Sequence, residues 1–114
     1  MSFNLTVRTI APHRHAIADV HDIICYYREQ AGTAVAENFA IEMDEACARL
    51  RQNPNIGSPR PALELDIEGI KSWALKRFPH QIFYEIQNDH VELWRILHPR
   101  RDISQATLSR QRFQ

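Results

Sequence analysis

The stretch from Lys71 to Asp102, KSWALKRFPHQIFYEIQNDHVELWRILHPRRD, decides the fold of this chain. Its β-branched, aromatic and aliphatic residues fall into three runs that are typical of strands: Ser72–Arg77, Gln81–Ile86 and His90–His98. Two short breaks separate these runs, at residues 78–80 and 87–89, and the second break has the length of a hairpin turn. The stretch therefore predicts a small sheet that is mainly antiparallel.

A two-residue turn at Asn88-Asp89 sets a register for the hairpin. The expected pairs are Ile86–Val91, Glu85–Glu92, Tyr84–Leu93, Phe83–Trp94, Ile82–Arg95 and Gln81–Ile96. Directly opposed carboxylates are unfavourable, so either Glu85 and Glu92 lie in solvent or a bulge shifts the register.

This register gives the sheet two apolar faces. One face carries side chains that suit a helical cover: Ile82, Tyr84, Ile86, Val91, Leu93 and Leu97. The other carries Phe83, Trp94 and Ile96, although an exposed sheet face is usually polar. A second cover is therefore needed, and either residues 103–114 or a partner protein would supply it.

The residues before the sheet predict a strand followed by two helices. Phe3, Leu5 and Val7 alternate with polar residues as in a half-buried strand, which ends at Thr9–Pro12, where Pro12 opens a helix. The first helix has an apolar stripe of Ile17, Val20, Ile23, Ile24, Tyr27 and Ala31 and stops at Gly32. The second is capped by Thr33, ends at Asn53-Pro54, and has a stripe of Val35 or Ala36, Phe39, Met43, Ala46 or Cys47, and Leu50.

Because so few residues connect the two helices, they form an antiparallel hairpin that packs on the sheet. Glu37, Glu42, Asp44 and Glu45 are expected on the solvent side of the second helix. Residues 54–70 read as a crossing loop with a short extended piece, and residues 103–114 as a short C-terminal helix. The whole chain, 1–114, is thus expected to form one α+β domain.

Composition narrows the class of protein. The 114 residues are 44% hydrophobic and 25% charged, with no apolar run near the ~20 residues of a membrane helix and no secretory leader, so we expect a cytoplasmic protein. Two cysteines, Cys25 and Cys47, do not make a metal site, and no cofactor is expected. The net charge of zero argues against sequence-specific binding to nucleic acid, although eight basic and four acidic residues follow from Lys71 onward.

Several residues in the sheet half are cations or imidazoles, which can contact anions or transfer protons. These residues are Lys76, Arg77, His80, Arg95, His98 and Arg101. Each also has an ordinary interpretation, because Lys76 and Arg77 are typical of a solvated strand end. Arg95 is expected near the helices, where Asp22 or Glu45 would pair with it. His98 suits either proton transfer or simple hydrogen bonding.

Taken in order, these features resemble the ParE branch of the RelE/ParE toxins over residues 3–103. The resemblance is carried by the helix end Leu50-Arg51-Gln52-Asn53-Pro54 with Gly57, by Phe78-Pro79, by Ile82-Phe83-Tyr84, and by Arg95-Ile96-Leu97-His98 with Arg101-Asp102. It implies the toxin of a bacterial toxin–antitoxin pair that stabilises plasmids or arrests growth. A ParD-like antitoxin with an amphipathic helix and an extended tail would neutralise it.

The resemblance leaves three functions open. A ParE-like toxin is not an enzyme and poisons DNA gyrase; we expect target contacts from Lys76, Arg77, His98, Arg100 and Arg101. Antitoxin contacts are expected from Phe83, Trp94, Ile96 and Trp73. A RelE-like toxin instead cuts mRNA on the ribosome, with Lys76, Arg77, Arg95, His98 and Arg101 as catalytic residues. The third alternative is a non-toxic binding protein of the same fold.

Overall fold

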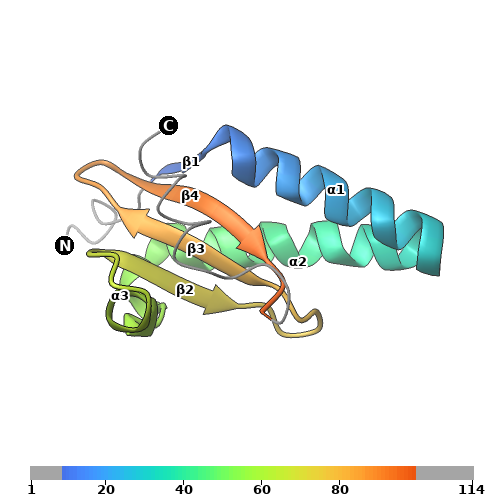
Figure 1. The fold of residues 1–114 in the computed structure, drawn as a ribbon. Coiled ribbons are helices and arrows are strands. Elements are labelled where there is room, and N and C mark those ends of the chain that lie inside the picture. The colour runs from blue at the N-terminus through green and yellow to red at the C-terminus, as the bar shows by residue number, and fades with distance from the viewer. Residues whose placement is uncertain (1–8, 100–114) are drawn as a thin grey trace.

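The chain folds as a helical hairpin packed on a four-stranded sheet (Figure 1). The structure, a computed structural model, describes residues 9–99. Its elements are β1 (Thr9–Pro12), α1 (Arg14–Ala31), α2 (Thr33–Gln52), η2 (Pro54–Ile56), α3 (Arg60–Glu64), β2 (Ile70–Ala74), β3 (Gln81–Ile86) and β4 (His90–Leu97). The α+β class is confirmed. The expected strand at Phe3, Leu5 and Val7 and the helix at 103–114 lie outside the described residues.

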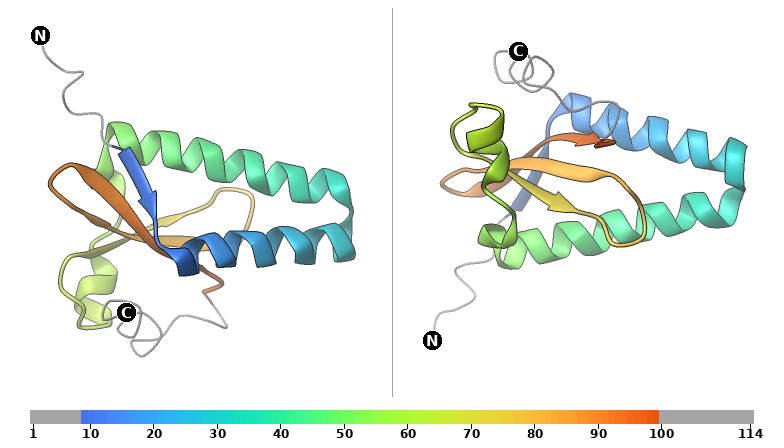
Figure 2. Two further views of the ribbon diagram at one scale, coloured as in Figure 1. Left: turned by 90° about the horizontal axis from the view of Figure 1, so that it is seen from above. Right: turned by 60° about the horizontal axis from the view of Figure 1, so that its bottom comes forward.

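The strand order is β1-β4-β3-β2, with β1 parallel to β4 and the other neighbours antiparallel. Figure 2 shows the long helices α1 and α2 on one face of this sheet and their connection projecting beyond its end. No helix among residues 9–99 is long and apolar enough to cross a membrane.

One expectation about the N-terminal part of the chain was wrong. Pro12 ends β1 instead of opening the helix, and α1 begins at Arg14 after His13. The His13 ring caps the helix, because its Nδ1 accepts the His15 N–H at 3.1 Å, and the His13 N–H donates to the Leu93 carbonyl at 2.8 Å. The helix start is thereby fixed to β4.

The hairpin of helices is confirmed, and Gly32 ends α1 as expected. Gly32 has a φ of 98°, in the left-handed region that favours glycine, and this conformation turns the chain directly into α2. Thr33 is the first residue of α2 rather than its cap, and no side chain caps this helix start. The stripe of α2 is buried as predicted, whereas Ile17 of α1 is 56% exposed.

The sheet contains a β-bulge that corrects the expected register. Ile86–Val91, Glu85–Glu92 and Tyr84–Leu93 pair as predicted, but Phe83 pairs with Arg95, Ile82 with Ile96 and Gln81 with Leu97. Trp94 is the extra residue, since the shift falls between Phe83 and Tyr84. Ile96 consequently faces the helices and Leu97 faces away, the reverse of the expectation. Strand β2 also lies earlier in the chain than expected, at Ile70–Ala74 instead of Ser72–Arg77.

The second face of the sheet is covered by the chain's own residues between α2 and β2. Expected to be a loop with an extended piece, this segment instead forms η2 and α3. Its apolar side chains Ala62, Leu65 and Ile67 join the second-face cluster, whose sheet residues are Ile70, Phe83, Trp94 and Leu97. This segment was not the expected cover, which was residues 103–114 or a partner protein; residues 103–114 lie outside the described part of the chain.

Tyr84 connects this segment to the sheet. Its buried hydroxyl donates to the Pro54 carbonyl at 2.6 Å and accepts the Gly57 N–H at 3.0 Å. Gly57 is required here, because a Cβ at this position would overlap the Tyr84 ring and hydroxyl. The exit of α2 is therefore held against β3.

Candidate functional site

The predicted site residues lie in three different places. Lys76 and Arg77 follow β2, Arg95 is within β4, and His98 follows the end of β4. Arg100 and Arg101 lie outside the described residues. Lys76, Arg77 and Arg95 are the cations of the predicted site that the described residues contain.

Glu42 holds the basic segment after β2. Its buried carboxylate accepts the backbone N–H groups of Lys76 and Arg77, the latter at 3.0 Å, and the Arg77 Nε–H at 3.1 Å. Burial raises the pKa of Glu42, but the bonds from Arg77 and Lys76 outweigh it and leave the pKa below its ordinary value. The expectation that Glu42 faces solvent was wrong.

The sequence holds a weak signal for this role of Glu42. The residue lies directly before Met43 and three residues after Phe39, so it borders the buried stripe of α2. The geometry positions the backbone at residues 76 and 77 while leaving the Arg77 side chain 61% exposed.

Arg95 is used within the fold. Its guanidinium forms a two-pronged ion pair with Asp19 of α1, at 2.7 and 2.8 Å, and the Ile96 N–H donates to the same carboxylate at 3.0 Å. Both side chains are largely buried, at 20% and 14% exposed. A helix carboxylate was expected as the partner, and it is Asp19 of α1, not Asp22 or Glu45.

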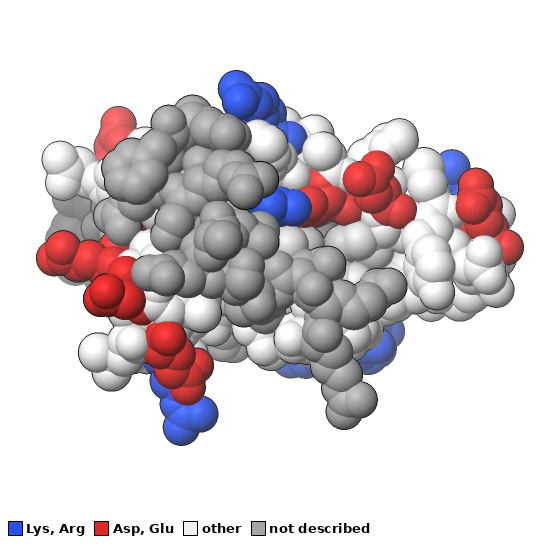
Figure 3. Space-filling model, in the orientation of Figure 1, with Lys and Arg blue, Asp and Glu red and all other residues white. Residues whose placement is uncertain are grey.

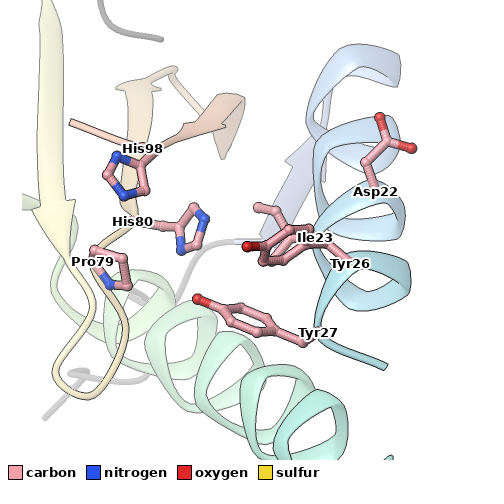
Figure 4. Close-up of a pocket in the computed structure, with 7 residues that line it drawn as sticks. All are labelled: Asp22, Ile23, Tyr26, Tyr27, Pro79, His80 and His98. Carbon is pink, nitrogen blue, oxygen red and sulfur yellow. The ribbon is translucent and has the colours of Figure 1, made fainter. Parts of the chain in front are cut away.

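His98 lines a hollow of ≈ 420 Å³ between α1 and the loop before β3 (Figure 4). The remaining lining residues are Asp22, Ile23, Tyr26, Tyr27, Pro79 and His80. In Figure 4 the rings of Tyr26 and Tyr27 extend from α1 toward His80 and His98, while the exposed carboxylate of Asp22, also on α1, is directed away from these rings. Tyr26 is 54% exposed. Tyr26 and Tyr27 were not predicted as site residues. The sequence does hold a signal for them, because Tyr26 falls outside the apolar stripe of the first helix whereas Tyr27 belongs to it.

A set of packed rings forms the inner wall of this hollow. His80 stands edge-on to His98 with ring centroids 5.6 Å apart. Tyr27, Phe39, Phe78 and His80 contact one another with centroids between 5.2 and 6.1 Å. These contacts hold the projecting half of the helical hairpin against the loop between β2 and β3.

The residues expected to contact an antitoxin differ in accessibility. Phe83, Trp94 and Ile96 are 1%, 4% and 2% exposed, so their side chains belong to the core. Trp73 is half-buried and lines two hollows at the β2 edge, of ≈ 510 and ≈ 430 Å³. Arg49 and Lys76 line the first of these and Arg60 the second. Trp73 is thus the member of this set that a partner reaches directly.

The described charges do not gather into one basic surface on the face drawn in Figure 3. There the Lys and Arg side chains lie apart from one another, with Asp and Glu between them. Lys76 and His98 line different hollows, Arg95 is bound to Asp19, and Arg77 is bound to Glu42. Within residues 9–99, the cations do not converge on His98, and no three potential metal ligands gather.

Comparison with known proteins agrees with this architecture. The sequence model of a family described as "ParE toxin of type II toxin-antitoxin system, parDE" matches residues 10–103. A solved structure described as "Chromosomal ParDE TA system from P. aeruginosa" superposes with a TM-score of 0.69 at 22% identity, over 82% of this chain and 97% of that one. A search of curated protein sequences found no match.

The chain belongs to the ParE toxin family, because the family model spans most of its length. It is therefore a toxin of the type II toxin–antitoxin class, with an antitoxin as partner.

Proposed function

We propose that this toxin inhibits DNA gyrase in the bacterial cytoplasm and is neutralised by a cognate ParD-like antitoxin. Family membership supports a poison of this kind. The observation that carries the choice of target is the separation of the groups an RNA-cleaving site would need. Arg95 is bound to Asp19, and Lys76 and His98 lie in different hollows.

The chemistry explains why that separation matters. Cleavage of RNA requires a base for the 2′-hydroxyl, an acid for the leaving oxygen and cations around one phosphate. A guanidinium held at 2.7 Å by a buried carboxylate is already neutralised. A toxin that works by binding needs only an accessible surface, which the exposed side chains of Lys76 and Arg77 and the half-buried His98 supply. Arg100 and Arg101 are proposed as further contacts.

For the antitoxin, we assign Trp73 as a central contact. A half-buried tryptophan with a hollow on each side is the kind of residue that dominates protein interfaces. Phe83, Trp94 and Ile96 act behind it by keeping the sheet rigid.

Induced expression in bacteria tests the proposed target. We expect growth arrest, an induced DNA-damage response and intact bulk mRNA, all reversed when the antitoxin is co-expressed. Rapid loss of intact mRNA without a DNA-damage response would support the mRNA endonuclease instead. A folded protein with no effect on growth would support the non-toxic binding protein.

A further inference from the structure

The hollow beside His98 has a lining that discriminates between kinds of ligand. Four of its residues carry aromatic rings: Tyr26, Tyr27, His80 and His98. Its only carboxylate belongs to Asp22, whose side chain is 81% exposed, and no Lys or Arg occurs among the lining residues of the described chain. Aromatic faces, hydroxyl oxygens and one carboxylate together favour a cation and disfavour an anion.

Among residues 9–99, the neighbouring arginines are already paired with other carboxylates. Arg95 lies on the adjacent strand but is paired with Asp19, one helical turn before Asp22. Arg77, in the loop that precedes Pro79, is bound by Glu42. Asp22 itself lies 3.7 Å from the exposed imidazole of its neighbour His21. The rim of the hollow therefore keeps its negative character.

The shape of the hollow favours a planar cation on a long stem. A volume of ≈ 420 Å³ is at the lower end of the ~300–1,000 Å³ range of ligand pockets, which suits one large side chain. A guanidinium stacks on aromatic rings and carries five donors for hydroxyl and carboxylate oxygens, whereas an ammonium does neither as well. Because Tyr27 and His80 are held by Phe39 and Phe78, the inner wall exists before a partner arrives.

We propose that this hollow is an anchor pocket for an arginine side chain of the antitoxin. The guanidinium lies against Tyr26 and Tyr27, and Asp22 pairs with it at the rim. This inference rests on the antitoxin pairing proposed above. It has a direct consequence, because an arginine seated here covers His98, a proposed target contact. The antitoxin would then neutralise the toxin by occupying part of the surface that the target needs.

The affinity of the purified toxin for its antitoxin tests the anchor. Asp22→Asn removes the charge without changing shape, and Tyr26→Leu removes the ring face while keeping apolar area. We expect Asp22→Asn to raise the dissociation constant roughly threefold to tenfold and Tyr26→Leu roughly tenfold. Glu29→Gln, which neutralises an exposed carboxylate of α1 outside the hollow, is the matched control and should stay within about twofold.

A small probe tests the pocket independently of the antitoxin. N-acetyl-arginine amide, added to the free toxin at millimolar concentration, should shift the NMR signals of Tyr26 and His98 in a saturable way. Its neutral isostere, N-acetyl-citrulline amide, should not.

These experiments distinguish failure of the arginine pocket from failure of the proposed antitoxin pairing. If the wild-type toxin fails to bind the antitoxin, the proposed pairing is wrong, and the arginine probe still decides the nature of the pocket. Wild-type antitoxin affinity in both variants overturns the anchor. Equal shifts with the arginine and citrulline probes overturn it as well, because the pocket would then not select a cation.

Discussion

Buried polar side chains bind the irregular segments of this toxin to its regular frame. Glu42 binds the backbone after β2, Tyr84 binds the exit of α2, and Asp19 binds both Arg95 and the backbone of β4. Glu42 and Tyr84 are buried and Asp19 is largely buried, and each forms hydrogen bonds to specific atoms of another element. Removing one partner therefore leaves another buried polar group without a bond, which costs more than the bond itself contributes.

Glu42→Gln should lower the free energy of unfolding by about 1–3 kcal/mol at pH 7, because an amide cannot accept from Lys76 and Arg77 as a carboxylate does. The folded-state pKa of Glu42 lies below its ordinary value of 4.5, so its contribution is complete above pH 4.5 and is lost as the pH falls through the folded-state pKa. Urea unfolding of both proteins from pH 7 to pH 3 measures this.

The gap between wild type and Glu42→Gln should therefore shrink on acidification. Glu45→Gln is the control, since Glu45 is exposed on the same helix. A pH-independent gap would contradict the role of the ionised carboxylate.

Tyr84→Phe should cost about 1–3 kcal/mol, because it leaves the Pro54 carbonyl and the Gly57 N–H without their partner. Burial raises the pKa of Tyr84 to about 12, above the ordinary value of 10. The unfolded chain ionises first, so the wild type loses stability relative to Tyr84→Phe between pH 10 and about 12. Unfolding measured at pH 8 and pH 11 decides this, and equal gaps at both would contradict it.

At the scale of elements, strong periodicity predicted what lies in the core and local irregularity escaped prediction. The stripe of α2, the strand Gln81–Ile86 and the turn into β4 followed from spacing alone. A bulge was one of the two alternatives that the Glu85–Glu92 pair left open, but its position at Trp94 was not predicted, because no residue type marks it. This one extra residue exchanged the faces of Ile96 and Leu97. The short helices η2 and α3 were not predicted either, because the prolines and glycines of this segment are compatible with many kinds of turn and loop.

The candidate site was less predictable than the fold for a physical reason. Sequence supplies the residue types, but pairing between distant elements decides which cations remain available. Arg95 was expected to meet a helix carboxylate, yet only the crossing of α1 and β4 selects Asp19 over Asp22. The hollow beside His98 joins Tyr26 and Tyr27 to residues more than fifty positions later, and spacing cannot reveal such a meeting.

Trp94→Ala should lower the free energy of unfolding by about 3–5 kcal/mol, because the indole is buried against the segment before β2. The milder Trp94→Phe keeps the protein folded for binding measurements and should leave antitoxin affinity unchanged. Ile41→Ala, at a half-exposed position of α2, is the control for stability. Unchanged stability of Trp94→Ala with weakened antitoxin binding by Trp94→Phe would show that this sheet face is a docking surface.

The molecule as a whole separates a rigid centre from the surfaces that partners meet. The sheet and its two covers bury Phe83, Trp94 and Ile96, while Trp73, Lys76 and the hollow beside His98 lie at the periphery. In the proposed function, the antitoxin and the target meet edges and loops that buried polar bonds hold in place. This arrangement suits a toxin that acts by binding, since it positions contacts without assembling a reaction centre.

A gyrase assay with supercoiled plasmid and the purified toxin tests the central claim most directly. We predict that linear DNA accumulates, as gyrase is trapped with its DNA cleaved, and that equimolar antitoxin prevents it. Unchanged gyrase activity in the presence of folded, antitoxin-binding toxin would contradict the claim.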